Sequence, residues 1–207
     1  MDLQDSPADG AACIAAGVVV DGIERAADLP LPPRLAAPEP VFGRLGLADG
    51  GWIRHAAWPF PDADAARGTV VLLGGRSEFI EKYDGIAHAL RGRGWRVLAA
   101  DWRSQGGSSR FLADPQKGHV PDFGVLEADL GLYLDTVAAP LRGPGPLVLL
   151  GHSMGAHLVL RLLAARPGAA DAAILSAPMA DICLGGFPPG LARRLARSMA
   201  ALGLGSA

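Results

Sequence analysis

The sequence predicts an α/β fold in which a mostly parallel sheet carries helices on both faces. Its apolar runs are short and lack polar alternation, which is typical of strands that are buried on both sides. Segments of helical length separate these runs, and this alternation implies parallel strands. A third observation is the pentapeptide Gly151-His152-Ser153-Met154-Gly155, which joins an apolar strand pattern to an apolar helix pattern.

The elements follow one another in a simple order. Asp49-Gly50 lies between two short runs and predicts an antiparallel hairpin at the start of the domain. Strands and helices then alternate. We expect strands at residues 41–47, 52–58, 69–73, 95–100, 147–150 and 172–175. We expect helices at residues 80–91, 123–138 and 154–165.

Three regions differ in composition. Five prolines between residues 29 and 40 predict an extended N-terminal arm over residues 1–40. Residues 41–184 hold the predicted α/β core. Residues 185–207 contain a helix with Leu191, Leu195 and Met199 on one side and arginines elsewhere. Such a stripe either packs on a neighbouring protein surface or faces lipid.

The composition is that of a globular protein. Of the 207 residues, 50% are hydrophobic and 19% are charged, which allows a sizeable core. The 19 basic and 21 acidic residues nearly cancel, so the overall charge favours neither nucleic acid nor an acidic membrane surface as a partner.

The cysteines, the N-terminus and the apolar runs bear on metal binding, secretion and membrane insertion. Cys13 and Cys183 lie outside any CxxC pattern and are expected to be free thiols. We therefore expect no metal site, and no bound cofactor. The N-terminus lacks the basic segment of a signal peptide, and no apolar run is long enough to span a bilayer. These features predict a cytoplasmic protein.

Ser153 is the candidate nucleophile. A serine on a sharp turn between strand and helix holds its hydroxyl clear of the sheet, and Gly151 and Gly155 let the two elements approach closely. The backbone N–H of Met154 would then point toward an oxyanion formed at Ser153, and His152 is expected to contact the substrate. The alternative is a glycine-rich turn without chemistry.

The loop after the strand at residues 69–73 is the second candidate. Glycines in Gly74-Gly75-Arg76-Ser77 let the backbone approach a ligand, so Gly75 is expected at the substrate and the Arg76 N–H is a second oxyanion donor. The alternative is a tight turn capped by Ser77. Asp101, after the next strand, is expected to be structural.

No histidine of this chain is expected to act as the general base. The candidates are His55, His88, His119, His152 and His157. The last of them lies one helical turn beyond Ser153 on the same helix rather than across from it. In this type of turn the acid and the histidine follow the serine. We therefore expect both groups to lie beyond the last residue of this chain.

At these motifs the sequence resembles the α/β-hydrolase superfamily, and more narrowly its lysophospholipase and monoacylglycerol-lipase-like branch, often labelled serine aminopeptidase-like. The resemblance extends from residue 41 to the C-terminus. Gly74-Gly75 stands where many relatives carry His-Gly, a difference that leaves the backbone donor in place. The supporting segments are residues 72–83, 101–106, 118–120, 151–155 and 176–179.

The resemblance implies a serine esterase that cleaves a lysophospholipid, monoacylglycerol or similar ester through an acyl-enzyme on Ser153. It also implies that residues 185–207 begin a helical cap, and that the rest of the cap, the last strands, the triad acid and the triad histidine are missing. The chain alone is then expected to be inactive, with its strand around Ile174 as an unpaired edge.

Three alternatives remain from the sequence. They are a non-catalytic binding or interaction module of the same fold, a peptidase, and a hydrolase completed by a separate chain. The expected partner is a small ester or lipid and not nucleic acid. Peripheral membrane contact through the cap stays open, and the sequence does not indicate an oligomeric state.

Overall fold

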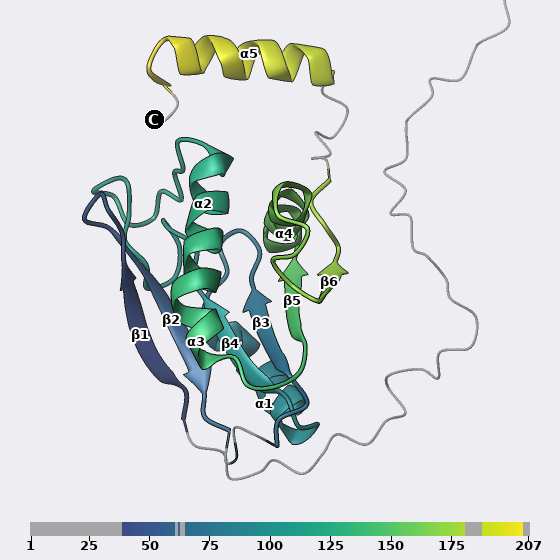
Figure 1. Ribbon diagram of the computed structural model, residues 1–207. Coiled ribbons are helices and arrows are strands. Elements are labelled where there is room, and N and C mark those ends of the chain that lie inside the picture. Colours follow the sequence, from purple (N-terminus) through teal and green to yellow (C-terminus); the bar gives the residue numbers. More distant parts are fainter. Residues whose placement is uncertain (1–38, 61, 63–64, 181–187, 205–207) are drawn as a thin grey trace, which may run out of the picture. The chain divides into compact units, whose positions relative to one another are not determined.

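The computed structural model describes residues 39–60, 62, 65–180 and 188–204 (Figure 1). Residues up to Ala180 form the core, and helix α5 (Pro189–Ala201) belongs to a second unit that is described by itself. Most of the predicted N-terminal arm, Cys13, Cys183 and the first residues of the predicted cap lie outside the described residues.

The core is built on one six-stranded sheet with the strand order β1-β2-β4-β3-β5-β6. Strands β1 (Val41–Gly46) and β2 (Trp52–Trp58) form the predicted antiparallel hairpin. Its turn is closed by a hydrogen bond of 2.9 Å from Leu47 N to Gly51 O, with Gly50 at a φ of 82°. β2 then pairs antiparallel with β4 (Arg96–Ala100).

The remaining strand pairs are parallel, as predicted. β3 (Thr69–Leu73) lies between β4 and β5 (Leu147–His152), and β6 (Ala172–Ser176) pairs with β5 at the edge of the sheet. Within the described residues the outer edge of β6 is unpaired, and Ile174 is 53% exposed. The expectation of an open edge at this strand is thus confirmed for the described part of the chain.

Each face of the sheet carries its own hydrophobic core. Because side chains alternate along a strand, Val71 and Leu73 enter one core and Val70 and Leu72 enter the other. Helices α2 (Phe123–Tyr133) and α4 (Met154–Ala165) cover the first face, and α1 (Asp84–Gly92) covers the second. Figure 1 shows α2 and α4 on the near face of the sheet. The prediction of helices on both faces is confirmed.

Two helices differ from their predicted bounds. The segment that was expected to be helical from residue 80 begins with a 3₁₀ turn, Ile80–Tyr83, before α1. In a 3₁₀ turn side chains three positions apart are aligned, so Ile80 and Tyr83 both reach the same core.

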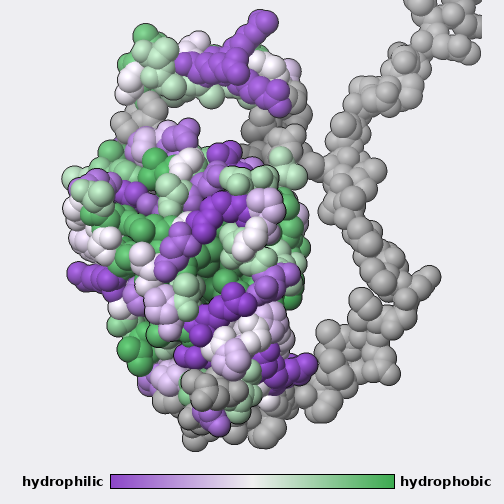
Figure 2. All heavy atoms as spheres, viewed as in Figure 1, coloured by the Kyte–Doolittle hydropathy of each residue, from purple (hydrophilic) through white to green (hydrophobic). Residues whose placement is uncertain are grey.

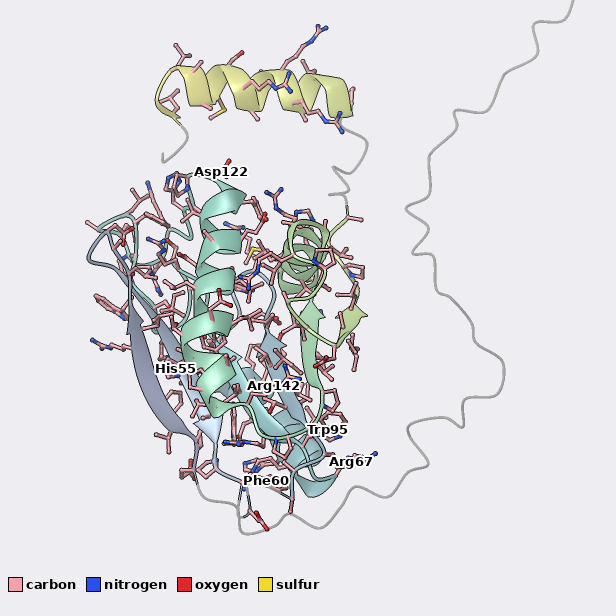
Figure 3. All side chains as sticks on the ribbon, viewed as in Figure 1. His55, Phe60, Arg67, Trp95, Asp122 and Arg142 are labelled. Carbon is pink, nitrogen blue, oxygen red and sulfur yellow. The ribbon has the colours of Figure 1, made fainter. Side chains whose placement is uncertain are left out.

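The helix predicted at residues 123–138 begins as expected but ends differently. Asp122 accepts a hydrogen bond from Gly124 N at 2.5 Å and so caps the start of α2 (Figure 3). After α2 the chain continues through a π turn, Leu134–Ala138, into α3 (Ala139–Leu141). Pro140 has no N–H, so the regular bond to the carbonyl four residues earlier is lost there.

A buried ion pair fixes α2 to the sheet. Both oxygens of Asp129 on α2 accept hydrogen bonds from Arg103, in the loop after β4, at 2.7 and 2.6 Å. Both side chains are less than 10% exposed. Asp135 forms a similar two-bonded pair with Arg166 at 3.0 and 2.8 Å, but on the surface. The two pairs share geometry and differ in burial.

Replacing Asp129 by Ala should therefore lower the free energy of unfolding by about 3 kcal/mol, because it leaves the buried Arg103 guanidinium with only the half-exposed Asp49 as a charged partner. The matched change Asp135→Ala should cost less than about 1 kcal/mol, because water screens an exposed pair. Urea titrations of both variants measure the difference. Equal losses would contradict the structural role given to the buried pair.

Candidate active site

Ser153 sits on a strained turn between β5 and α4. Its backbone has φ 50° and ψ −112°, a conformation that residues with a side chain rarely adopt. His152 is the last residue of β5 and Met154 is the first of α4, so the predicted strand, turn and helix are all present. Such strain amounts to about 1–3 kcal/mol and persists only where the surroundings enforce it.

The two flanking glycines permit this turn. A Cβ on Gly155 would lie 2.2 Å from Leu73 O and 2.5 Å from Gly74 O, so the first turn of α4 touches the backbone of β3. A Cβ on Gly151 would lie 2.6 Å from Ala156 Cα. Both positions require the absence of a side chain, as predicted.

Hydrogen bonds from the neighbouring strand hold Ser153 in place. Ser153 N donates to Ser176 O at 3.0 Å, and Met179 N donates to Ser153 O at 3.1 Å. Ser176 ends β6, and Met179 lies in the segment just after it. The residues after β6 thus brace the turn from one side.

Residues with strained backbone lie at one end of the parallel strands. Among the described residues, four that are not glycine have a positive φ. Each lies shortly after the end of a parallel strand: Ser77 after β3, Ser104 after β4, Ser153 after β5 and Ala177 after β6. These four residues therefore lie at the carboxyl ends of the parallel strands. In open α/β sheets, ligands bind just outside these ends.

The loop after β3 lies beside the turn at Ser153. A Cβ on Gly75 would lie 3.2 Å from Ser153 Cβ and 3.2 Å from His152 Nδ1, so this glycine lies against the turn. Within the described part of the chain, neither the Arg76 N–H nor the Met154 N–H is engaged in a hydrogen bond. Met154 begins its helix, where N–H groups have no acceptor in the helix itself. The structure thus places Gly75, directly before Arg76, beside Ser153 and His152.

Glu78 organises this loop, a role that the sequence analysis missed. Its carboxylate accepts hydrogen bonds from Gly75 N at 2.5 Å, Tyr83 OH at 2.5 Å and Lys82 Nζ at 2.8 Å. His152 Nδ1 lies 3.0 Å from the same carboxylate. Glu78 therefore links the loop after β3 to the residue before Ser153. Its only sequence signal was its spacing of four residues from Lys82.

These contacts set the charge state of Glu78. Burial alone raises the pKa of this carboxyl, but the hydrogen bonds from Lys82, Tyr83, Gly75 and His152 together lower the pKa to about 2. The carboxylate therefore remains charged over the whole ordinary pH range.

Residues in the loop after β4 form hydrogen bonds with the loop after β3. Trp102 Nε1 donates to Gly74 O at 2.7 Å, and the Gln105 side chain accepts from Ser77 N. Both oxygens of Asp101 are used structurally: one accepts from Ile80 N at 2.9 Å and the other from Gly107 N at 2.8 Å. The structural interpretation of Asp101 agrees with these contacts.

No described side chain forms a hydrogen bond with Ser153 Oγ. All five histidines are described. The rings of four of them have other neighbours: Tyr133 for His55, Asp84 for His88, Glu78 for His152 and Phe123 for His157. The backbone carbonyl of His119 accepts a hydrogen bond from Ser104 Oγ at 2.6 Å. The described residues also contain no group of three His, Cys, Asp or Glu that could hold a metal ion.

Fold and motifs agree with comparisons to known proteins. Residues 64–204 match the family described as serine aminopeptidase, S33, and the chain belongs to this family of hydrolases. The fold is the α/β-hydrolase fold. The thioesterase domain from the curacin biosynthetic pathway has a TM-score of 0.61 at 21% identity, over 80% of this chain and 53% of that one.

Another similar structure is a soluble variant of monoglyceride lipase from Saccharomyces cerevisiae in complex with a substrate analog. Its TM-score is 0.59 at 22% identity, and the match covers 84% of this chain and 55% of that one. At this level of identity the likeness concerns the fold.

Sequence relatives carry more specific names. Lysophospholipase L2 of Escherichia coli K12 is 39% identical over 127 residues, which cover 61% of this chain and 36% of that protein. Monoglyceride lipase of Mus musculus is 28% identical over 132 residues, which cover 64% of this chain and 41% of that protein. The match thus spans well under half the length of either relative.

The charge on Glu78 gives a pH-dependent prediction. A carboxyl whose pKa falls from 4.5 to about 2 on folding stabilises the protein above pH 5, by about 3 kcal/mol. This contribution is lost as the pH falls toward 2. The variant Glu78→Gln should therefore be less stable than the parent at pH 7, and the difference should shrink between pH 5 and pH 2.

Urea titrations at each pH measure this difference. Glu127→Gln is the matched control, because Glu127 pairs with Arg161 on the surface and should lose less than about 1 kcal/mol at any pH. A difference between Glu78→Gln and the parent that stays constant with pH would contradict the role of the charged carboxylate.

Proposed function

We propose that Ser153 is the nucleophile of a carboxylic-ester hydrolase whose substrates are lysophospholipids or monoacylglycerols. The observation that carries this proposal is the strained turn at Ser153, together with two backbone N–H groups, those of Arg76 and Met154, that have no acceptor among the described residues. The names of the relatives, lysophospholipase and monoglyceride lipase, support the substrate class.

The reaction would proceed through an acyl-enzyme. Ser153 Oγ gives its proton to a histidine and attacks the ester carbonyl carbon, whose oxygen becomes an oxyanion. The N–H groups of Arg76 and Met154 donate to that oxyanion, and one such donor contributes about 10²–10³ in turnover. The histidine returns the proton to the leaving alcohol, and water then releases the fatty acid from Ser153. Gly75 and His152 lie beside the reacting carbonyl.

In this proposal the proton acceptor comes from outside the described residues. None of the five histidines bonds to Ser153 Oγ among the described residues, which supports a catalytic histidine and aspartate supplied by another segment or another chain. Loss of a triad serine or histidine lowers turnover by about 10⁶. The described residues alone are therefore expected to be nearly inert, although they hold the nucleophile and the oxyanion donors.

The test uses the longest product of the reading frame that contains residues 1–207, beside its Ser153→Ala variant. Each is incubated with monooleoylglycerol and with oleoyl-lysophosphatidylcholine, and released oleate is measured by mass spectrometry. We expect release that falls at least about 10³-fold in the variant. Release that is unchanged by the substitution would contradict Ser153 as nucleophile, and no release from any substrate would favour a non-catalytic binding module.

The family description favours a second candidate, a peptidase, because acyl transfer to serine serves amides as well as esters. An aminoacyl-p-nitroanilide in the same assay distinguishes the two. Cleavage of the anilide, lost in Ser153→Ala and without oleate release, would replace the esterase proposal by the peptidase.

A further inference from the structure

The described part of the chain has a largely apolar cavity but no membrane-spanning helix. None of its helices is long and apolar enough to cross a membrane. The cavity has a volume of about 420 Å³, within the range of small-molecule sites. It is lined by β1, β2, β4, the residues after β2 and Leu141 of α3, whereas Ser153 follows β5, two strands further in the sheet. All of its lining residues belong to the core, so the cavity is defined without α5.

The strand register explains how the cavity forms. Val41, Ala57 and Leu98 lie side by side on β1, β2 and β4. Two positions further along, Gly43 lies beside His55 on the same face of the sheet (Figure 3). A Cβ on Gly43 would lie 2.5 Å from the His55 ring. Figure 2 shows apolar residues on the left side of the core, where the β1–β2 hairpin lies. Gly43 and Ala57 are too small to fill the space above these strands.

One end of the cavity is cationic and the other is neutral. Arg96 begins β4 and lines the cavity, and among the described residues it has no hydrogen bond or ion pair. His55 lies level with Ala100, the last residue of β4, and burial lowers the pKa of its ring, so it is uncharged at neutral pH. The described residues that line the cavity include no aspartate or glutamate. Arg96 therefore gives the cavity a positive charge at one end.

The length between these ends suits an alkyl chain. Arg96 and Ala100 are four residues apart on a strand that rises about 3.3 Å per residue, so the ends are about 13 Å apart. An extended hydrocarbon advances about 1.3 Å per carbon, so about ten carbons fill this length. The lining between the ends, with Ala57, Leu98 and Phe60, is apolar. A buried water needs about two to four polar partners, so this lining favours a hydrocarbon over water.

We propose that the cavity binds a free fatty acid of about eight to ten carbons, with its carboxylate on Arg96 and its alkyl chain over Ala57 and Leu98. The planar guanidinium of an arginine can donate two parallel hydrogen bonds to a carboxylate. The inference goes beyond the proposed function, because it assigns a second site that does not include Ser153. A fatty acid is also the acid product of the proposed ester hydrolysis.

Isothermal titration calorimetry of the full chain tests the charge. Decanoate and decyltrimethylammonium have the same alkyl chain and opposite charges, and both are used well below the concentrations at which they form micelles. We expect decanoate to bind about 10- to 100-fold more tightly, because its carboxylate accepts charge-assisted hydrogen bonds from Arg96. The variant Arg96→Gln should lose this preference.

The matched control is Arg93→Gln. Arg93 is exposed at the end of α1, where it donates to Ala89 O at 3.1 Å, and its loss should leave decanoate binding unchanged. Equal loss of affinity in both variants would overturn the proposal. It would also be overturned by full retention in Arg96→Gln, by equal affinity of the parent for the two amphiphiles, or by no binding of decanoate up to about 1 mM.

A second set of titrations tests the apolar part of the cavity. Each carbon from hexanoate to decanoate should tighten binding by about fourfold, because each adds a buried CH₂ group. Ala57→Leu fills the cavity and should weaken decanoate binding at least about 10-fold, whereas Ala164→Leu, at an exposed position of α4, should not. Affinity that does not depend on chain length, or full retention in a folded Ala57→Leu protein, would overturn the proposal. If urea titration shows that Ala57→Leu does not fold, Arg96→Gln and the chain-length series decide.

Failure of this proposal is distinguishable from failure of the proposed reaction. Ser153→Ala should bind decanoate like the parent, because Ser153 does not line the cavity. Decanoate binding without any oleate release would count against the proposed reaction only. Oleate release that depends on Ser153, without decanoate binding, would count against the cavity only.

Discussion

The close contact between the first turn of α4 and the backbone of β3 is the constraint on which the site depends. Leu73 O and Gly74 O lie where a side chain on residue 155 would begin, so α4 can start only if that residue is glycine. This contact fixes the direction in which β5 turns into α4, and it leaves Ser153 at a φ of 50°. Bonds to Ser176 and Met179 then hold the strained residue.

The loop after β3 packs against the turn at Ser153. Gly75 lies against Ser153, and Glu78 ties the Gly75 backbone to His152. A single carboxylate therefore links the loop that carries Arg76 to the turn that carries Ser153 and Met154. In the proposed reaction, N–H donors held in this way would stabilise charge in the transition state without reorganising at the moment of reaction.

The sequence predicted the sheet, its hairpin and the turn at Ser153, because local patterns carry that information: apolar runs, Asp49-Gly50, and glycines two residues on either side of a serine. It missed Glu78, whose partners Gly75, Tyr83 and His152 meet only in the folded chain. It also missed the π turn before Pro140 and the 3₁₀ turn at Ile80, where local backbone chemistry and packing change a helix without changing its apolar pattern. The roles of Arg76 and Met154 stay predictions.

The most direct measurement of the central claim is the free energy of unfolding of Gly155→Ala. The clash is with backbone oxygens that cannot move aside, so we expect a loss of about 3 kcal/mol. Gly168→Ala, just after the same helix, meets nothing within 4 Å and should change stability by less than about 0.5 kcal/mol. A Gly155→Ala protein as stable as Gly168→Ala would contradict the claim that this contact holds the turn at Ser153.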